Sequence, residues 1–161
     1  MNEITYRPFR AETDFEAAAR LHQMLNTLEG EMGAHRETSL AAGRLCLEDD
    51  VRLVGEEGGE ILVAELGGAV IGYCSHHFER RGPYVPAHWQ LCLYVKNLMI
   101  DEAHRGRGIG TVFLEMAEHF ARKSGVKLVC LGVVAGNGRA EATYRKQGYR
   151  PISFEMAKEL D

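Results

Sequence analysis

The segment that most constrains the fold lies in the middle of the chain, where a strand, a glycine-rich loop and a helix follow one another. Residues 91–100, LCLYVKNLMI, form an apolar run that predicts a buried strand. After the loop HRGRGIGT at residues 104–111, apolar side chains recur at the spacing of one helix face: Ile109, Phe113, Met116 and Phe120. Gly125 predicts the end of this helix. The loop therefore lies at a helix N-terminus, where the first backbone amides have no partner within the helix.

The loop combines backbone freedom with positive charge, which suits an anionic ligand. Its glycines are Gly106, Gly108 and Gly110, so the dinucleotide fingerprint G-x-G-x-x-G fails because the third glycine comes one residue early. A Walker loop fails because no lysine stands between Gly110 and Thr111. A plain surface turn needs one glycine and not three. We interpret the loop as a local phosphate site at a helix N-terminus.

The composition is that of one globular domain and excludes several other classes. A chain of 161 residues with 45% hydrophobic and 26% charged residues fits a single domain over residues 1–161. The net charge of −4 gives no reason to expect nucleic acid as a partner. No apolar run approaches the roughly 20 residues of a membrane span, and the polar start MNEITYRPFR is not typical of a signal peptide. We expect no membrane partner.

Four cysteines are spread along the chain, each among apolar or small neighbours: Cys46, Cys74, Cys92 and Cys130. No CxxC pair occurs, and nothing has the ligand spacing of a zinc site, so no metal is expected. This usage predicts free thiols in a reducing, cytoplasmic environment.

Hydrophobic periodicity predicts alternating strands and helices around the central segment. The expected strands are residues 4–10, three strands within 51–78, 91–100, 127–134 and 149–160. The expected helices are residues 13–25, a short one at 39–48, the helix after the glycine loop, and 138–147. Residues 79–90 are expected to form an exposed hairpin loop, and residues 28–31 to lie in a polar loop.

A second motif supports a family resemblance. The loop matches R/Q-x-x-G-x-G/A at Arg105, Gly108 and Gly110, and residues 137–149, NGRAEATYRKQGY, match N-x-x-A-x-x-x-Y-x-x-x-G-F/Y. In this order the two blocks resemble the GCN5-related N-acetyltransferase (GNAT) superfamily over about residues 91–149, and the stretch LYVKNLMI also resembles polyamine (diamine) acetyltransferases. The resemblance implies an α/β (α+β) GNAT fold. We expect a mixed, mostly antiparallel central sheet of about seven strands, splayed at its centre and flanked by about four helices.

The resemblance also implies that acetyl-CoA binds as co-substrate, and it assigns residues to that role. The pantetheine arm would pair with Leu98, Met99 and Ile100 and meet Asn137 on the far side. The pyrophosphate would lie on the loop, and Arg139 is close enough in sequence to reach a phosphate. The loop residues so assigned are Arg105, Gly106, Arg107, Gly108, Ile109, Gly110 and Thr111.

The chemistry implied is direct transfer of acetyl to a primary amine in a ternary complex, with Tyr144 as general acid. His76 is the first candidate for general base, with His77, Glu79 and a water chain as alternatives. Because His76 and His77 are neighbours on a strand, at most one faces the cleft. A non-catalytic acyl-CoA sensor is the alternative function. The family analogy also suggests a homodimer, in which the final strand could pair across the interface.

The acceptor is left open between a small-molecule amine, an amino-acid-like amine, a peptide N-terminus and a lysine side chain. Lys96 and Asn97 stand where polyamine acetyltransferases commonly carry an acidic pair, which argues against a polycationic acceptor. The acidic segment LEGE at residues 28–31 can contact an amine, whereas Lys96 and Arg36 can favour a carboxylate.

Overall fold

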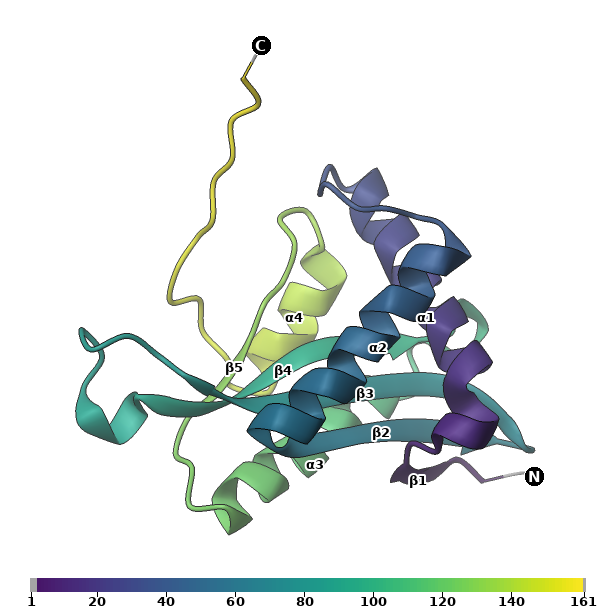
Figure 1. Cartoon of the computed structure of the whole chain (residues 1–161), viewed down its shortest axis with the longest axis horizontal. Coiled ribbons are helices and arrows are strands. Elements are labelled where there is room, and N and C mark those ends of the chain that lie inside the picture. The colour runs from purple at the N-terminus through teal and green to yellow at the C-terminus, as the bar shows by residue number, and fades with distance from the viewer. Residues whose placement is uncertain (1–2, 161) are drawn as a thin grey trace.

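The structure is a computed structural model that describes residues 3–160 (Figure 1). Within this range the α-helices are α1 (Ala11–Glu31), α2 (Leu40–Glu57), α3 (Ile109–Lys123) and α4 (Gly138–Lys146). The strands are β1 (Thr5–Pro8), β2 (Gly59–Leu66), β3 (Ala69–Arg80), β4 (Leu91–Ile100) and β5 (Val129–Leu131). Two short 3-10 helices, Ala87–Trp89 and Glu102–His104, flank β4.

The strands form one mixed sheet in the order β1-β2-β3-β4-β5. The first four are antiparallel to their neighbours, and β5 runs parallel to β4. Helices α1 and α2 pack on one face of the sheet, and α3 packs on the other (Figure 1). The mixed, mostly antiparallel sheet and the four helices predicted from the sequence are confirmed.

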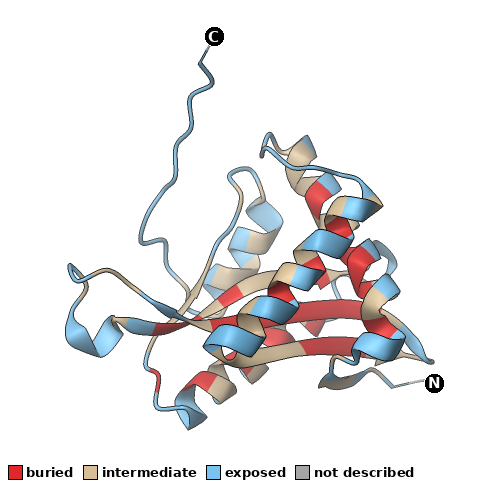
Figure 2. Ribbon diagram, viewed as in Figure 1, coloured by how far each residue is buried: buried red, intermediate tan, exposed pale blue. Residues whose placement is uncertain are grey.

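Each face of the sheet has its own apolar core, which appears in Figure 2 as buried segments on the strands and on the inner helix faces. On the α3 side, Phe113 is fully buried among Leu62, Leu93 and Val95. On the α1 and α2 side, Leu47 packs near Tyr73. Burial of a side chain of this size stabilises the fold by about 1.5–3 kcal/mol, so the two cores fix the helices on the sheet.

The expectation of about seven strands is wrong, since the described residues contain five. Residues 51–57, expected as a strand, form the second half of α2 instead. Ser39 caps that helix by accepting a hydrogen bond from the Ala42 amide at 3.1 Å. Leu47 and Asp50 then lie three residues apart on its buried face. The apolar residues Val51, Leu53 and Val54 therefore belong to a helix that packs against α1.

The expected strand at residues 149–160 is also absent: this tail is extended and pairs with no strand (Figure 1). Its alternating apolar side chains are exposed: Ile152, Phe154, Met156 and Leu160. The strand expected at 127–134 is shortened to β5, because only three residue pairs join it to β4.

All four cysteines are free thiols, as predicted. Cys74 and Cys92 are buried in the sheet, and Cys46 and Cys130 are half-buried.

No helix among residues 3–160 combines the length and apolar character needed to cross a membrane.

Candidate active site

One cavity of about 310 Å³ collects most of the residues that the sequence singles out. It is lined by the second half of β4, the glycine loop, the start of α3, the chain beyond β5, α4 and one face of α1. Of the predicted cofactor residues and the predicted acid, those that line it are Leu98, Met99, Ile100, Arg105, Gly106, Gly108, Ile109, Gly110, Thr111, Asn137, Arg139 and Tyr144.

The cavity opens where β4 and β5 part. Their pairing begins at Leu93 with Val129 and stops at Val95 with Leu131. Beyond Val95, β4 continues to pair with β3 on its other edge as far as Ile100. The β5-side edge of residues 96–100 therefore faces the cavity with backbone groups that have no strand partner, which agrees with the predicted splay. An extended ligand can add to such an edge as a strand would.

A β-bulge lies in β4 at the entrance to this splay. Ser75 of β3 pairs with Asn97, but His76 pairs with Val95, so Lys96 is the extra residue. A bulge interrupts the alternation of side chains along a strand. As a result Lys96 and Asn97, although consecutive, both contact the carboxylate of Asp50 on α2.

The glycine loop presents a row of free amides at the start of α3. Gly106 and Gly108 have φ angles of +78° and +79°, a region that favours glycine. Gly108 is the N-cap of α3 and provides no side chain to cap the helix. Within residues 3–160, no protein group accepts a hydrogen bond from the six amides of residues 106–111. With the positive end of the α3 dipole, these free amides have the chemistry that suits an anionic ligand.

The arginines near the loop have different roles. The Arg105 Nε donates to the Ile100 carbonyl at 3.0 Å, which fixes the turn from β4 into the loop. A Cβ added to Gly106 would lie 3.8 Å from Arg139 Nη2, so this guanidinium lies beside the amides. The Arg107 side chain is not among the residues that line the cavity; its Nη1 lies 3.1 Å from Nδ1 of His104, which does line it. The assignment of Arg107 to the cofactor stays a prediction.

Helix α4 brings Asn137 and Tyr144 to the opposite wall. The Asn137 Oδ1 caps the helix by accepting from the Ala140 amide at 3.1 Å, which leaves its Nδ2 as a donor. Tyr144 lies two turns further on, with its ring 6.2 Å from that of Tyr149. Burial, with smaller effects from the charges of Cys74 and Glu29, raises the pKa of Tyr144 to about 12. The hydroxyl therefore stays protonated at neutral pH.

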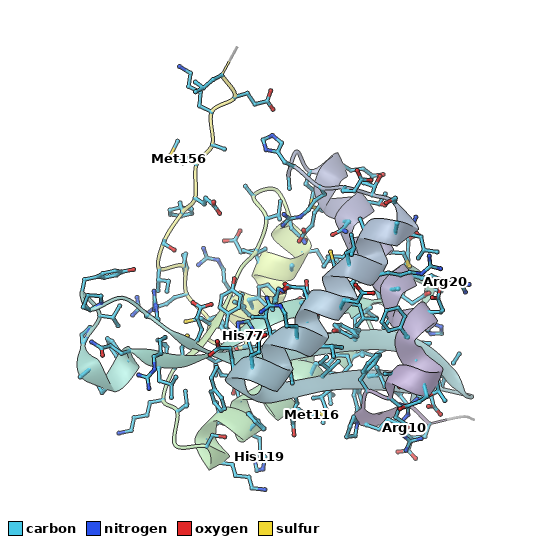
Figure 3. The ribbon with its side chains drawn as sticks, viewed as in Figure 1. Arg10, Arg20, His77, Met116, His119 and Met156 are labelled. Carbon is cyan, nitrogen blue, oxygen red and sulfur yellow. The ribbon has the colours of Figure 1, made fainter. Side chains whose placement is uncertain are left out.

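None of the three side chains considered as general base lines the cavity. His76 is fully buried on the α3 side, where its ring centroid lies 4.9 Å from that of Phe120, and burial lowers its pKa to about 4. His77 points to the other face, near Tyr94 (Figure 3). Glu79 lies near the far end of β3. Because His76 is buried outside the cavity, the structure gives no support to its choice as base. Strand alternation separates His76 from His77 but does not place either of them at the cleft.

Asp50 lies behind the cavity wall and contacts two lining residues, Lys96 and Asn97, a role that was not predicted from the sequence. Its buried carboxylate accepts hydrogen bonds from the Tyr73 and Ser75 hydroxyls, both at 2.7 Å, and from the Asn97 amide. The Lys96 Nζ lies 3.2 Å from Asp50 Oδ1 and also contacts Asp49. In the sequence, the burial of Asp50 is indicated only by its position three residues after Leu47, on the same face of the helix.

Glu29 is the one carboxylate among the described residues that line the cavity. It lies in the last turns of α1, because the segment LEGE, expected as a loop, is helical. Its side chain is 15% exposed, and its Oε2 accepts from Arg36 Nε at 2.6 Å. Long-range packing and not local pattern brings Glu29 to the cavity that holds Tyr144.

Comparison with known proteins agrees with this geometry. A model of the acetyltransferase (GNAT) family matches residues 18–149, so the chain belongs to this family. The chain is 32% identical over 75 residues to an uncharacterized N-acetyltransferase, YdgE, of Bacillus subtilis, covering 47% of this chain and 48% of that protein. It is 34% identical over 69 residues to the streptothricin acetyltransferase of Streptomyces lavendulae, covering 43% and 36%. The similarity thus spans less than half the length of these relatives.

A solved structure shares the fold over nearly the whole chain. It is the predicted acetyltransferase of Clostridium acetobutylicum, crystallised with acetyl-CoA, with a TM-score of 0.76 at 17% identity. The superposition covers 98% of this chain and 97% of that one. At this identity the similarity shows the fold alone.

Proposed function

We propose that the protein is an acetyl-CoA-dependent N-acetyltransferase that transfers acetyl directly to a primary amine in a ternary complex. The observation that carries the proposal is the row of free amides from Gly106 to Thr111, which shares one cavity with the β4 splay and Tyr144. Residues 1–161 would act as one catalytic domain.

The cavity offers a partner to each part of acetyl-CoA. The loop amides and Arg139 suit the pyrophosphate, which needs hydrogen-bond donors and positive charge. Arg105 would hold the loop in place. The free edge at Leu98, Met99 and Ile100 suits the pantetheine amides, with the Asn137 Nδ2 as a donor from the opposite wall. A backbone amide of the same edge would donate to the thioester carbonyl as negative charge develops there.

Tyr144 would protonate the leaving thiolate. Its raised pKa keeps the hydroxyl in the acidic form, and its position in the cavity wall suits a proton donor to the sulfur. A passive acyl-CoA sensor would not require this hydroxyl in the cavity. Because Lys96 lies in the wall, we do not extend the proposal to polyamine acceptors.

Calorimetric titration of acetyl-CoA tests the proposal. Wild-type protein should bind with a micromolar-range Kd, and Gly108→Asp should abolish binding because its carboxylate would occupy and repel the pyrophosphate position. Gly125→Asp is the matched control: Gly125 also has a positive φ, of +74°, and open space around its Cβ, but it lies at the other end of α3. Absence of wild-type binding, or equal loss in both variants, would refute the cofactor site.

We further propose that the protein is a cytoplasmic homodimer. The four free thiols fit a reducing compartment. The exposed side chains of Phe154 and Met156 fit a segment that a second copy would cover.

A further inference from the structure

The wall that α1 contributes to the cavity is apolar along one helix face and ends in a carboxylate. The apolar residues recur every three or four positions: Leu21, Met24, Leu25 and Leu28. Glu29 follows Leu28 and lies four positions after Leu25, so it continues the same face. A ligand that extends along this face meets four aliphatic side chains and one negative charge.

The Glu29 carboxylate has acceptor positions left for a second cation besides Arg36. Arg36 binds one carboxylate oxygen, Oε2, and the side chain is largely shielded from solvent. A carboxylate has two oxygens and about four acceptor positions, so the Arg36 contact leaves capacity for an ammonium group. Partial burial strengthens such a charge-assisted hydrogen bond relative to one at a fully exposed carboxylate.

The same carboxylate shares its cavity with the proposed site of acyl transfer. Burial chiefly raises the pKa of Tyr144, and the negative charge of Glu29 acts in the same direction as a smaller cause. Both residues line the one cavity. A cation bound at Glu29 would therefore occupy the same cavity as the group that would protonate the leaving sulfur.

Lys96 is poorly placed to recruit an anionic acceptor. Its ammonium contacts the carboxylates of both Asp49 and Asp50, so one positive charge faces two negative ones. This cluster favours neither a carboxylate on the acceptor, which the two aspartates repel, nor a second ammonium, which meets Lys96 itself. Among the described residues that line the cavity, Glu29 is thus the one carboxylate, and it lies beside the apolar face of α1.

We propose that Glu29 binds the acceptor's ammonium group and that the acceptor is a primary amine on an uncharged, apolar stem that packs on the Leu25 and Leu28 face of α1. This inference rests on the proposed acetyl transfer. The ammonium gives one proton to the Glu29 carboxylate, which releases it to water. The amine lone pair attacks the thioester carbonyl, a C–N bond forms and the C–S bond breaks. Sulfur takes the Tyr144 proton, and the second proton lost by nitrogen restores Tyr144.

Three acceptors of equal length test the substrate class. They are n-hexylamine, 6-aminohexanoate and 1,6-diaminohexane, which end in a methyl group, a carboxylate and a second ammonium. We expect kcat/KM to be highest for n-hexylamine, by about tenfold or more, since a second charge must be desolvated against the apolar wall. A preference for either charged acceptor, or no acetylation of any of the three by protein that binds acetyl-CoA, would overturn the inference.

Glu29→Gln tests the role of the carboxylate, and Glu31→Gln, on an exposed position of the same helix, is its control. We expect Glu29→Gln to lower kcat/KM for n-hexylamine by about 10- to 100-fold at unchanged Kd for acetyl-CoA, and Glu31→Gln to change it less than about twofold. The loss in Glu29→Gln should shrink as pH rises from 7 to 9, because this variant uses only the free amine. Equal activity of Glu29→Gln and wild type would overturn the inference, whereas failure of wild type to bind acetyl-CoA would overturn the proposed function itself.

Discussion

Asn97 of β4 donates a hydrogen bond from Nδ2 to Oδ1 of Asp50 on α2, 2.9 Å away, and so ties the strand that borders the cleft to the helix layer. The β-bulge at Lys96 makes this contact possible beside the Lys96–Asp50 ion pair. Tyr73 and Ser75 of β3 donate to the same carboxylate. One buried charge thereby fixes two strands and the bulge that shapes the cavity.

Replacement of this charge should destabilise the fold. Asp50→Asn keeps the shape of the side chain but places an NH2 group where Tyr73, Ser75 and Asn97 donate to a buried carboxylate, so we expect the free energy of unfolding to fall by about 3 kcal/mol. Asp49→Asn is the control, because Asp49 is 44% exposed and such pairs contribute less than about 1 kcal/mol. Urea unfolding at pH 7 measures both. Similar losses in the two variants would show that the buried position of Asp50 does not increase its contribution to the free energy of unfolding.

The buried His76 predicts that stability falls as the pH drops from about 6.5 toward 4. Burial lowers its pKa in the folded state to about 4, from 6.5 in the unfolded chain. Between these values the unfolded state binds the extra proton, so stability is complete above about pH 6.5 and falls as pH drops toward 4. The shift corresponds to a loss of about 3 kcal/mol.

Denaturant unfolding of wild type and His76→Phe between pH 7 and 4 measures this contribution. Phenylalanine keeps a ring against Phe120, and the variant should lose most of the pH dependence in this window. A pH dependence identical to that of wild type would mean that His76 is not the group responsible.

The strand, loop and helix at residues 91–123 could be predicted because each is specified by contiguous residues. The apolar run of β4, the glycines and the helical spacing from Ile109 to Phe120 all lie in one short segment, and the structure places them as expected. The anion site follows from the same local order, since the free amides belong to the start of the helix.

Features that depend on distant partners were not predictable. The bulge at Lys96 appears only in the register with β3, and the burial of Asp50 depends on packing between α2 and the sheet. Residues 51–54 are rich in β-branched and apolar side chains, which favoured a strand, but the helix that Ser39 caps continues through them. His76 and His77 show the same limit: alternation separates them but does not say which face meets the cleft.

Tyr144→Phe should impair catalysis and spare cofactor binding. The variant keeps the ring but removes the proton donor, so we expect kcat to fall by about 100-fold with little change in the Kd for acetyl-CoA. Tyr149→Phe is the control, because its ring lies next to that of Tyr144 but does not line the cavity. Steady-state kinetics and calorimetry on both variants separate the two effects, and a kcat for Tyr144→Phe equal to wild type would exclude Tyr144 as the acid.

The exposed tail predicts how the dimer can be disrupted. Phe154 and Met156 are 89% and 94% exposed, so in the single chain they contribute no packing. Replacing both with glutamate should convert a dimer to a monomer in analytical ultracentrifugation, with little change in secondary structure by circular dichroism. A wild-type monomer, or a dimer that withstands both charges, would contradict the proposed role of the tail.

Two glycines of α2 should respond in opposite ways to alanine, because they differ only in what surrounds them. At Gly43 an added Cβ would lie 2.4 Å from the Ala19 carbonyl oxygen and 3.1 Å from the Gln23 amide nitrogen, both backbone atoms of α1. The two helices can accommodate it only by moving apart, and overpacking of this kind costs about 1–3 kcal/mol.

At Gly55 an added Cβ would meet nothing within 4 Å, so alanine brings only its higher helix propensity. We expect Gly55→Ala to stabilise the protein by up to about 1 kcal/mol, less if the C-terminal turn of α2 frays. Thermal unfolding of both variants measures the contrast within one helix. If Gly43→Ala is as stable as Gly55→Ala, α1 and α2 do not approach as closely as the structure shows, and the apolar wall of the cavity would shift with α1. The Gly43 result therefore bears directly on the position of Glu29.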